Sequence, residues 1–170
     1  DAPLQIDTAS PLAMERALRV YNGKALINSV NGSAESMASV FPLARKYGGA
    51  IIALPLDENG IPPTAEGRIA IAERILLEAS RYGIAKKDII LDGLAMTASA
   101  EPEAPKATLG TLSLARARLG LNTALGVSNV SFGLPEREAL NAAFFLMAVS
   151  QGLSAAIINP KSEPMRKAYA

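Results

Sequence analysis

The chain has 170 residues, of which 49% are hydrophobic and 19% charged, a composition typical of one globular domain with a sizeable core. Its formal net charge of +1, without a basic run, gives no reason to expect a nucleic acid or an anionic membrane as a partner. The chain contains no cysteine and no histidine, which excludes disulfides, thiolate nucleophiles, Ser-His-Asp triads and Cys/His metal sites. We therefore expect no metal site, and any chemistry must depend on other side chains or on a cofactor.

The first part of the chain predicts two strands separated by a helix. Leu4–Asp7 alternates apolar and polar residues, as a short strand ending in a carboxylate would. Ser10-Pro11 is a typical helix start, and Gly23 is a typical helix end. Lys24–Val30 then predicts a second strand with Asn28 near its end.

The same pattern repeats in the following residues. A helix over residues 33–47 should be bent or split at Pro42. Ala50–Leu54 is almost purely apolar, as expected for a parallel strand covered on both faces. After a long loop, Thr64 should cap a helix over residues 64–82.

The second half of the chain contains three further units of strand and helix. Strands are predicted over residues 88–93, 123–127 and 155–160, and helices over residues 108–119, 135–151 and from Ser162 onward. The first of these strands ends in a carboxylate at Asp92, and residues 96–105 read as a polar loop.

Six strands that alternate with amphipathic helices predict an α/β fold with a parallel sheet. No glycine-rich phosphate fingerprint follows the first strand, which speaks against an open doubly wound sheet. Polar residues at the carboxyl end of nearly every strand favour a (β/α)8 barrel of the TIM-barrel type, which needs roughly 250 residues when complete. We therefore predict about six of the eight barrel units; a six-unit open sheet is the alternative.

The stretch most typical of a site is Asn122–Pro135, N-T-A-L-G-V-S-N-V-S-F-G-L-P. Here an apolar strand runs into a turn that contains Gly126, Ser128 and Asn129. Glycine lets a ligand approach the backbone, and Ser and Asn side chains supply hydrogen-bond donors and acceptors. Because ligands of α/β proteins bind at the carboxyl ends of strands, this turn is a candidate site; an ordinary polar turn is the alternative.

Three other predicted strands also end in a polar side chain, at Asp7, Asn28 and Asp92. Singly, Asp and Asn commonly finish strands or cap helices. Together with Asn129 they would place two carboxylates and two amides around one mouth of the barrel. Such a set suits a ligand edge that is rich in N–H donors.

These motifs resemble a known family. G-V-S-N-V-S-F-G-L-P followed by R-E-A-L-N resembles the seventh βα loop of the methyltetrahydrofolate-binding domain of cobalamin-dependent methionine synthases and related corrinoid methyltransferases. I-D-T at Asp7, I-N-S-V at Asn28 and I-L-D-G at Asp92 resemble the other pterin-contacting strand ends of that family. The resemblance implies that residues 1–170 are a dihydropteroate synthase-like pterin-binding barrel, incomplete at the N-terminus because its first two βα units are missing.

The resemblance also implies roles for single residues. The substrate-binding residues would be Asp7, Asn28, Asp92, Gly126, Ser128 and Asn129. The first three would bind the pyrimidine edge of the pterin, while Asn129 would be the catalytic residue that reaches the methyl-bearing N5. Phe132 favours the methionine synthase branch, since the iron–sulfur branch tends to carry an amide there, and Arg137 could meet the carboxylate tail of the folate.

The implied function is that of a methyltransferase of one-carbon metabolism and methionine biosynthesis. The chain would bind 5-methyltetrahydrofolate and support transfer of its N5 methyl group to cob(I)alamin. Because the chain contains no histidine to ligate cobalt, the expected partner is a cobalamin-binding domain or corrinoid protein that carries the cobalamin. A homodimer is compatible with this scheme. The alternatives are a dihydropteroate synthase-like pterin enzyme and a non-catalytic folate-binding module of a multidomain assembly.

The location expected from the sequence is the cytoplasm. The longest apolar runs, Ala143–Val149 and Ala155–Ile158, are too short to span a bilayer. The first residues, Asp1-Ala2-Pro3-Leu4, lack a basic segment leading into an apolar one, so they do not read as a signal peptide. The lack of cysteine fits a reducing compartment.

Overall fold

The computed structural model describes residues 2–170. In this part of the chain, six strands form one parallel sheet, and their order in the sheet is their order in the sequence. The strands are β1 (Gln5–Asp7), β2 (Leu26–Asn31), β3 (Ala50–Leu54), β4 (Ile89–Asp92), β5 (Asn122–Gly126) and β6 (Ala155–Ile157). The α-helices are α1 (Pro11–Val20), α2 (Ala34–Tyr47), α3 (Ala65–Arg81), α4 (Ala104–Leu114), α5 (Arg137–Ser150) and α6 (Glu163–Tyr169).

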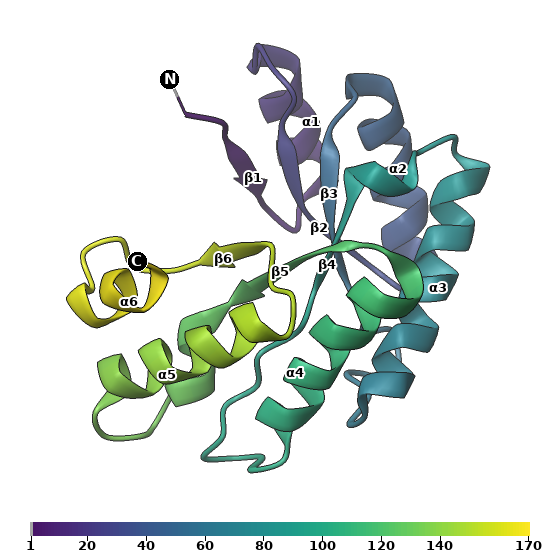
Figure 1. The fold of residues 1–170 in the computed structure, drawn as a ribbon. Helices are drawn as coiled ribbons and strands as arrows, with labels where there is room; N and C mark the ends of the chain where they lie inside the picture. The colour runs from purple at the N-terminus through teal and green to yellow at the C-terminus, as the bar shows by residue number, and fades with distance from the viewer. Residues whose placement is uncertain (1) are drawn as a thin grey trace.

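The sheet curls, with the helices arranged around its outer side and β1 and β6 as its edge strands (Figure 1). A doubly wound open sheet would reverse its strand order at a switch point, whereas here each strand pairs with the strands before and after it in the sequence. The arrangement is that of a curled half-barrel. The prediction of a barrel-type α/β fold with six βα units is therefore confirmed.

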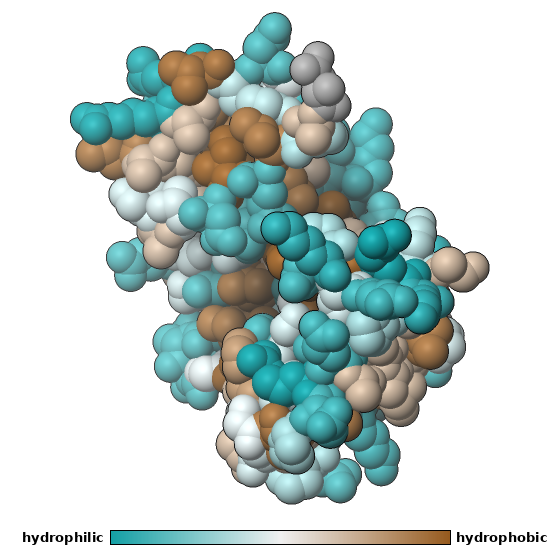
Figure 2. Space-filling view, turned by 90° about the vertical axis from the view of Figure 1, so that its left-hand side faces the viewer, coloured by the Kyte–Doolittle hydropathy of each residue, from teal (hydrophilic) through white to brown (hydrophobic). Residues whose placement is uncertain are grey.

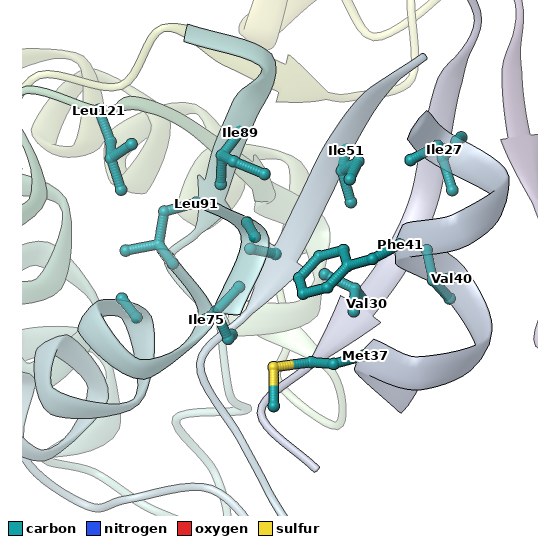
Figure 3. Packing of buried hydrophobic residues seen from close by; sticks show 14 of the residues in the cluster. Ile27, Val30, Met37, Val40, Phe41, Ile51, Ile75, Ile89, Leu91 and Leu121 are labelled. Atoms are coloured by element: carbon teal, nitrogen blue, oxygen red, sulfur yellow. The ribbon is translucent and has the colours of Figure 1, made fainter. Parts of the chain in front are cut away.

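Side chains alternate between the two faces of the sheet because successive residues of a strand point in opposite directions. The register pairs Ile6 with Ile27, Ile27 with Ile51 and Ile51 with Ile89, and these residues pack against the helices. Helices α2 and α3 contribute Phe41 and other apolar residues to this core (Figure 3). The next residue of each strand, starting with Asp7, must face the inner side of the curl.

Local capping agrees with the predictions for three helices. The side chains of Ser10, Ser33 and Thr64 each accept a hydrogen bond from a backbone N–H in the first turn of the helix that follows. Helix α2 ends at Gly48 in the left-handed conformation, with φ at 74°. The helix is not split at Pro42, contrary to one of the two outcomes we expected.

Three predicted helix boundaries were wrong. Helix α1 stops before Tyr21, short of the predicted glycine. Helix α4 begins at Ala104 instead of residue 108, because a proline fits the first turn of a helix and does not prolong the loop. After β5 the chain forms a short 3-10 helix, η3 (Val127–Ser131), and α5 begins only at Arg137, after Glu136 in the left-handed conformation.

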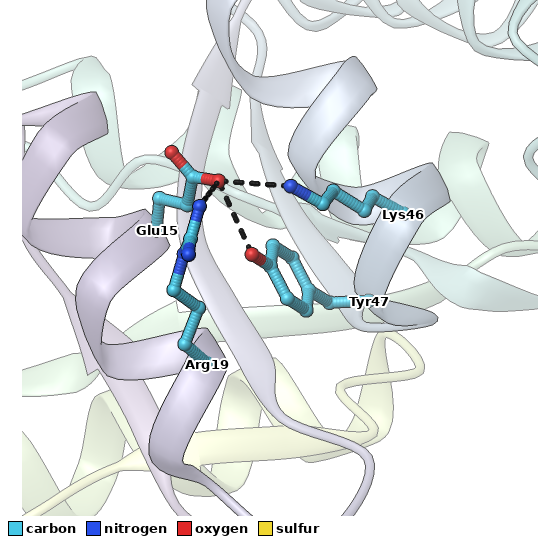
Figure 4. Close-up of polar contacts among 4 residues, drawn as sticks. All are labelled: Glu15, Arg19, Lys46 and Tyr47. Carbon is cyan, nitrogen blue, oxygen red and sulfur yellow. Dashed lines mark hydrogen bonds and ion pairs between the residues drawn. The ribbon is translucent and has the colours of Figure 1, made fainter.

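An ion-pair network on the surface connects α1 to α2 (Figure 4). One carboxylate oxygen of Glu15 accepts hydrogen bonds from Lys46 at 3.0 Å, Arg19 at 3.0 Å and the hydroxyl of Tyr47 at 3.1 Å. These donors, Lys46 first, lower the pKa of Glu15 from 4.5 to about 2. The ionised carboxylate therefore stabilises the contact between the two helices.

Replacing Glu15 by glutamine should lower the urea midpoint of unfolding at pH 7. Since the pKa of Glu15 falls on folding, its contribution to stability is complete above pH 4.5 and is lost as the pH drops toward 2. The urea midpoints of the two proteins should therefore converge in that range. Urea titrations across this range measure the difference. The control is Glu163→Gln, which removes one carboxylate from an isolated exposed pair with Lys167. A pH-independent difference between wild type and the Glu15 variant would contradict this role of the carboxylate.

Among the helices of residues 2–170, none combines the length and the apolar character that crossing a membrane requires.

Candidate functional site

Asp7, the last residue of β1, lies beside Asn28 of β2. The prediction that Asn28 ends its strand was wrong, because β2 continues for three more residues, to Asn31. Asp7 and Asn28 are register partners in the parallel ladder, and the backbone N–H of Thr8 donates to the carbonyl of Asn28 at 3.2 Å. Both residues line a pocket of about 450 Å³ between strands β1 and β2 and helices α1 and α2. The structure thus brings this pair of predicted site residues together in one pocket.

Hydroxyl groups line much of the same pocket. They belong to Thr8, Ser29, Ser33, Ser36 and Ser39. The hydroxyl of Ser36 accepts a hydrogen bond from the backbone N–H of Asn31 at 3.0 Å, and the side-chain oxygen of Asn31 accepts one from the backbone N–H of Ser33 at 2.9 Å. The sequence had indicated Ser33 only as a helix cap; the recurrence of serine every three residues was the signal for a polar helix face.

The inner face between the two edge strands combines apolar and polar side chains. Figure 2 looks onto this side of the molecule and shows hydrophobic residues near the centre, with hydrophilic residues around them. On this face Ile52 is buried, and Leu54 and Ile90 are half-buried. A flat ligand with a polar edge can be held by such an arrangement, since apolar surface covers its faces and the strand ends meet its edge.

Asp92 is the last residue of β4 and pairs in register with Ala124. Its carboxylate accepts a hydrogen bond from the backbone N–H of Leu94 at 2.7 Å, and Leu94 adopts a left-handed conformation with φ at 55°. Burial raises the pKa of Asp92 from 3.8 to about 6, although the bond from Leu94 and the charge of Arg68 act in the opposite direction. A half-buried carboxylate of this kind is a candidate for ligand binding.

Asn129 lies in the η3 turn, and Arg137 at the start of α5 donates hydrogen bonds to this turn. The guanidinium of Arg137 donates to the hydroxyl of Ser131 at 3.0 Å and to the carbonyl of Ser128 at 3.2 Å. It also lies 4.5 Å from the centre of the Phe132 ring. Arg137 therefore contacts the turn that carries Asn129, a role that its place in the sequence did not reveal.

Gly126 makes room for the side chain of Asn129. A Cβ atom placed on Gly126 would lie 3.3 Å from the amide nitrogen of Asn129, closer than most such contacts. The exposed amide of Asn129 thus lies beside Gly126 at the end of β5, and a Cβ at position 126 would require it to shift by a few tenths of an ångström. That Gly126 shapes the wall of a substrate site stays a prediction.

The loop after Asp92 and the turn around Asn129 are joined by hydrogen bonds. The backbone N–H of Ala98 donates to the carbonyl of Val130 at 3.0 Å. The carbonyl of Phe132 accepts from the hydroxyls of Thr97 at 2.7 Å and Ser99 at 2.9 Å. The position of each loop therefore depends on the other.

The predicted site residues thus form two groups at one end of the sheet. Asp7 and Asn28 share the pocket described above, whereas Asp92 and Asn129 lie beyond β3 and do not line it. Gly126 and Ser128 belong with the second group. The assignment of these six residues to a substrate stays a prediction.

Known proteins resemble this chain in sequence. A family model described as "Pterin binding enzyme" matches residues 1–159. A methionine synthase of Mycobacterium tuberculosis is 30% identical over 179 residues, covering 97% of this chain and 15% of its own length. A methylcorrinoid:tetrahydrofolate methyltransferase of Eubacterium limosum is 26% identical over 170 residues, covering 97% of this chain and 62% of its own length. The chain thus spans less than two thirds of these relatives.

Solved structures of dihydropteroate synthases share the fold. The enzyme of Yersinia pestis superposes with a TM-score of 0.76 over 99% of this chain and 70% of its own, at 18% identity. The enzyme of Coxiella burnetii, solved with pteroic acid, gives a TM-score of 0.75 over 98% of this chain and 64% of its own, at 17% identity. At these identities the likeness establishes the architecture alone.

Proposed function

Since the chain belongs to the pterin-binding enzyme family, we propose that it binds 5-methyltetrahydrofolate and supports transfer of the N5 methyl group to a reduced corrinoid. The observation that carries this proposal is the placement of four polar side chains along one sheet, with Asp7 and Asp92 at the ends of β1 and β4, Asn28 within β2 and Asn129 in the η3 turn after β5. The similarity to a methionine synthase and to a methylcorrinoid:tetrahydrofolate methyltransferase supports the methyl transfer.

The chemistry of the pterin suits these side chains. Its pyrimidine edge presents an amino group and a ring N–H. The carboxylates of Asp7 and Asp92 and the amide oxygen of Asn28 would accept hydrogen bonds from these groups. This leaves Asn129, on the last strand end of the group, to meet N5. Gly126 and Ser128 would form the wall beside it.

Methyl transfer from N5 needs electrostatic help because a tertiary amine is a poor leaving group. In the transition state a proton or a hydrogen bond must compensate the charge that develops on N5. Asn129 does not titrate, so it would orient and stabilise a protonated N5 and would not supply the proton itself. Its position over Gly126 limits where its amide can point.

A corrinoid would supply the nucleophile for this reaction. The chain contains no histidine and so offers no imidazole to ligate cobalt. The corrinoid would be carried by another domain or protein. The methionine synthase of M. tuberculosis is matched over only 15% of its length, which leaves most of that relative outside the comparison. This chain's own task would be to bind and orient the folate.

A dihydropteroate synthase-like activity is the alternative that the shared fold raises. That chemistry calls for basic side chains near the pterin to hold a pyrophosphate. Neither η3 (Val127–Ser131) nor the segment 158–160 after β6 contains Lys or Arg, and Arg137, which contacts η3, is engaged with Ser131 and the carbonyl of Ser128. The carboxylates and amides at the strand ends therefore favour the folate methyl donor.

Isothermal titration calorimetry with 5-methyltetrahydrofolate tests the first step, and loss of the absorbance of reduced free cobalamin in the presence of chain and folate tests the second. We expect micromolar binding and a chain-dependent methylation. Tetrahydrofolate, which lacks the methyl group, is the ligand control: it should bind without causing methylation. A folded chain that binds no folate would contradict the proposal, and binding without methylation would indicate a folate-binding module.

A further inference from the structure

Arg68 on helix α3 is a charged residue in an unusual place. Its side chain is 1% exposed and is among the largest fully buried side chains of the described residues. No carboxylate of residues 2–170 forms an ion pair with it. Burying a guanidinium is costly unless its N–H groups find acceptors, so the acceptors of Arg68 indicate what the residue does.

The guanidinium of Arg68 donates mainly to the loop that follows Asp92. It reaches the carbonyls of Gly93 at 2.8 Å and Leu94 at 3.1 Å, and the hydroxyl of Thr108 at 3.2 Å. Its Nε donates to a fourth acceptor, the carbonyl of Pro62, at 3.0 Å. The hydroxyl of Thr108 also contacts the carbonyl of Leu94, at 2.9 Å.

Leu94 connects this buried cation to the candidate site. Its carbonyl is held by Arg68 and Thr108, while its N–H donates to the carboxylate of Asp92 at 2.7 Å. The left-handed conformation of Leu94, with φ at 55°, is unfavourable for a leucine and persists only where its surroundings enforce it. The neighbouring Gly93 is tightly enclosed, since a Cβ there would lie 2.8 Å from Leu112.

The charge of Arg68 also acts on Asp92. The positive charge of Arg68 lowers the pKa of Asp92, against the burial that raises it. Burial lowers the pKa of the guanidinium itself, and Glu101 is the other acidic group that acts on it. Because Asp92 and Arg68 form no direct ion pair, the carboxylate remains available to a ligand.

We propose that Arg68 is a positioning residue: by holding the carbonyls of Gly93 and Leu94 it fixes the turn that aims the Asp92 carboxylate at the inner face of the sheet. This inference rests on the proposed function, in which Asp92 binds the pyrimidine edge of the pterin. Arg68 lies behind the loop, on the helix side, and does not touch the substrate.

The test compares Arg68→Met, which keeps the length and loses the charge and donors, with Arg68→Lys, which keeps the charge. Arg74→Met is the matched control, because Arg74 lies on the same helix in a surface pair with Asp57. Two quantities are measured: the pKa of Asp92 in the unliganded protein by carbon NMR of its carboxyl group, and the affinity for 5-methyltetrahydrofolate by calorimetry from pH 5 to 8.

In Arg68→Met we expect the pKa of Asp92 to rise by about 1 pH unit and the affinity at pH 7 to fall by about 10-fold. The midpoint of the pH dependence of binding should rise with the pKa. Arg68→Lys should restore the pKa better than the affinity, because an ammonium cannot reproduce the forked contacts of a guanidinium. Arg74→Met should behave as wild type.

A folded Arg68→Met protein with an unchanged pKa of Asp92 would overturn the proposal. If that variant does not fold, Thr108→Val takes its place: it removes one of the two groups that hold the carbonyl of Leu94, and a rise in the pKa of Asp92 supports the proposal whereas an unchanged pKa overturns it. If wild type binds no folate, the proposed function fails, and the titration of Asp92 still decides the role of Arg68.

Discussion

Replacing Asp92 by asparagine should weaken binding of 5-methyltetrahydrofolate by about 100-fold at pH 7, because the pterin would lose a charged acceptor for its N–H groups. The substitution keeps the size of the side chain and an oxygen that can accept from the backbone N–H of Leu94. Calorimetry of both proteins measures the loss. In wild type, affinity should also decline as the pH falls through the pKa of Asp92, about 6.

The same substitution should not destabilise the fold. The pKa of Asp92 rises from 3.8 to about 6 on folding, so the protonated form is favoured in the folded state and the ionised form opposes folding above that range. The ionisation of Asp92 should therefore cost the folded state an amount on the order of 3 kcal/mol as the pH rises from 4 to 6, which the difference between wild type and variant isolates from carboxylates of opposite shift such as Glu15. An asparagine side chain does not titrate, and urea unfolding of Asp92→Asn should lack this loss.

The matched control is Asp88→Asn. Asp88 precedes the same strand at its opposite end, where it pairs with Lys24 on the surface. This change should leave folate binding as in wild type. Equal affinities of wild type and Asp92→Asn across pH 5 to 8 would remove Asp92 from the site.

Replacing Asn129 by alanine should slow methyl transfer by about 100-fold, as the loss of one preorganised donor does in other enzymes. The affinity for 5-methyltetrahydrofolate should change much less, because the contact with N5 strengthens only as charge develops there. The rate is followed in single turnovers with reduced cobalamin, so that binding and transfer are separated.

Asn122→Ala is the control for this experiment. Asn122 begins strand β5 and accepts a hydrogen bond from Arg116 at 3.1 Å, at the end of the strand opposite to the η3 turn. The control should transfer the methyl group at the wild-type rate. If Asn129→Ala also transfers at that rate, the residue has no part in stabilising N5.

Much of the fold followed from local patterns in the sequence. Ser10, Ser33 and Thr64 were read as helix caps and act as caps, because capping depends on residues only three positions apart. The apolar run Ala50–Leu54 became a strand with the predicted bounds. The wrong boundaries lie where proline or a left-handed residue allows several starts, as before Ala104 and at Glu136.

The candidate site was predicted only in part. Asp7, Asn28, Asp92 and Asn129 could be selected because each follows an apolar strand, which is a local signal. Arg68 could not, since an arginine in an amphipathic helix normally reads as a surface residue, although its spacing from Ala72, Ile75 and Ala79 puts it on the buried stripe.

The sequence by itself determined the order of strands and helices, the N-terminal caps of three helices and the choice of polar residues near the strand ends, since each depends on near neighbours in the chain. The tertiary structure alone decided how these ends combine. Strand register placed Asp7 beside Asn28, packing buried Arg68 behind Asp92, and the fold joined the loop after β4 to the η3 turn. These properties arise from residues far apart in the sequence, whose contacts and desolvation exist only once the sheet has formed.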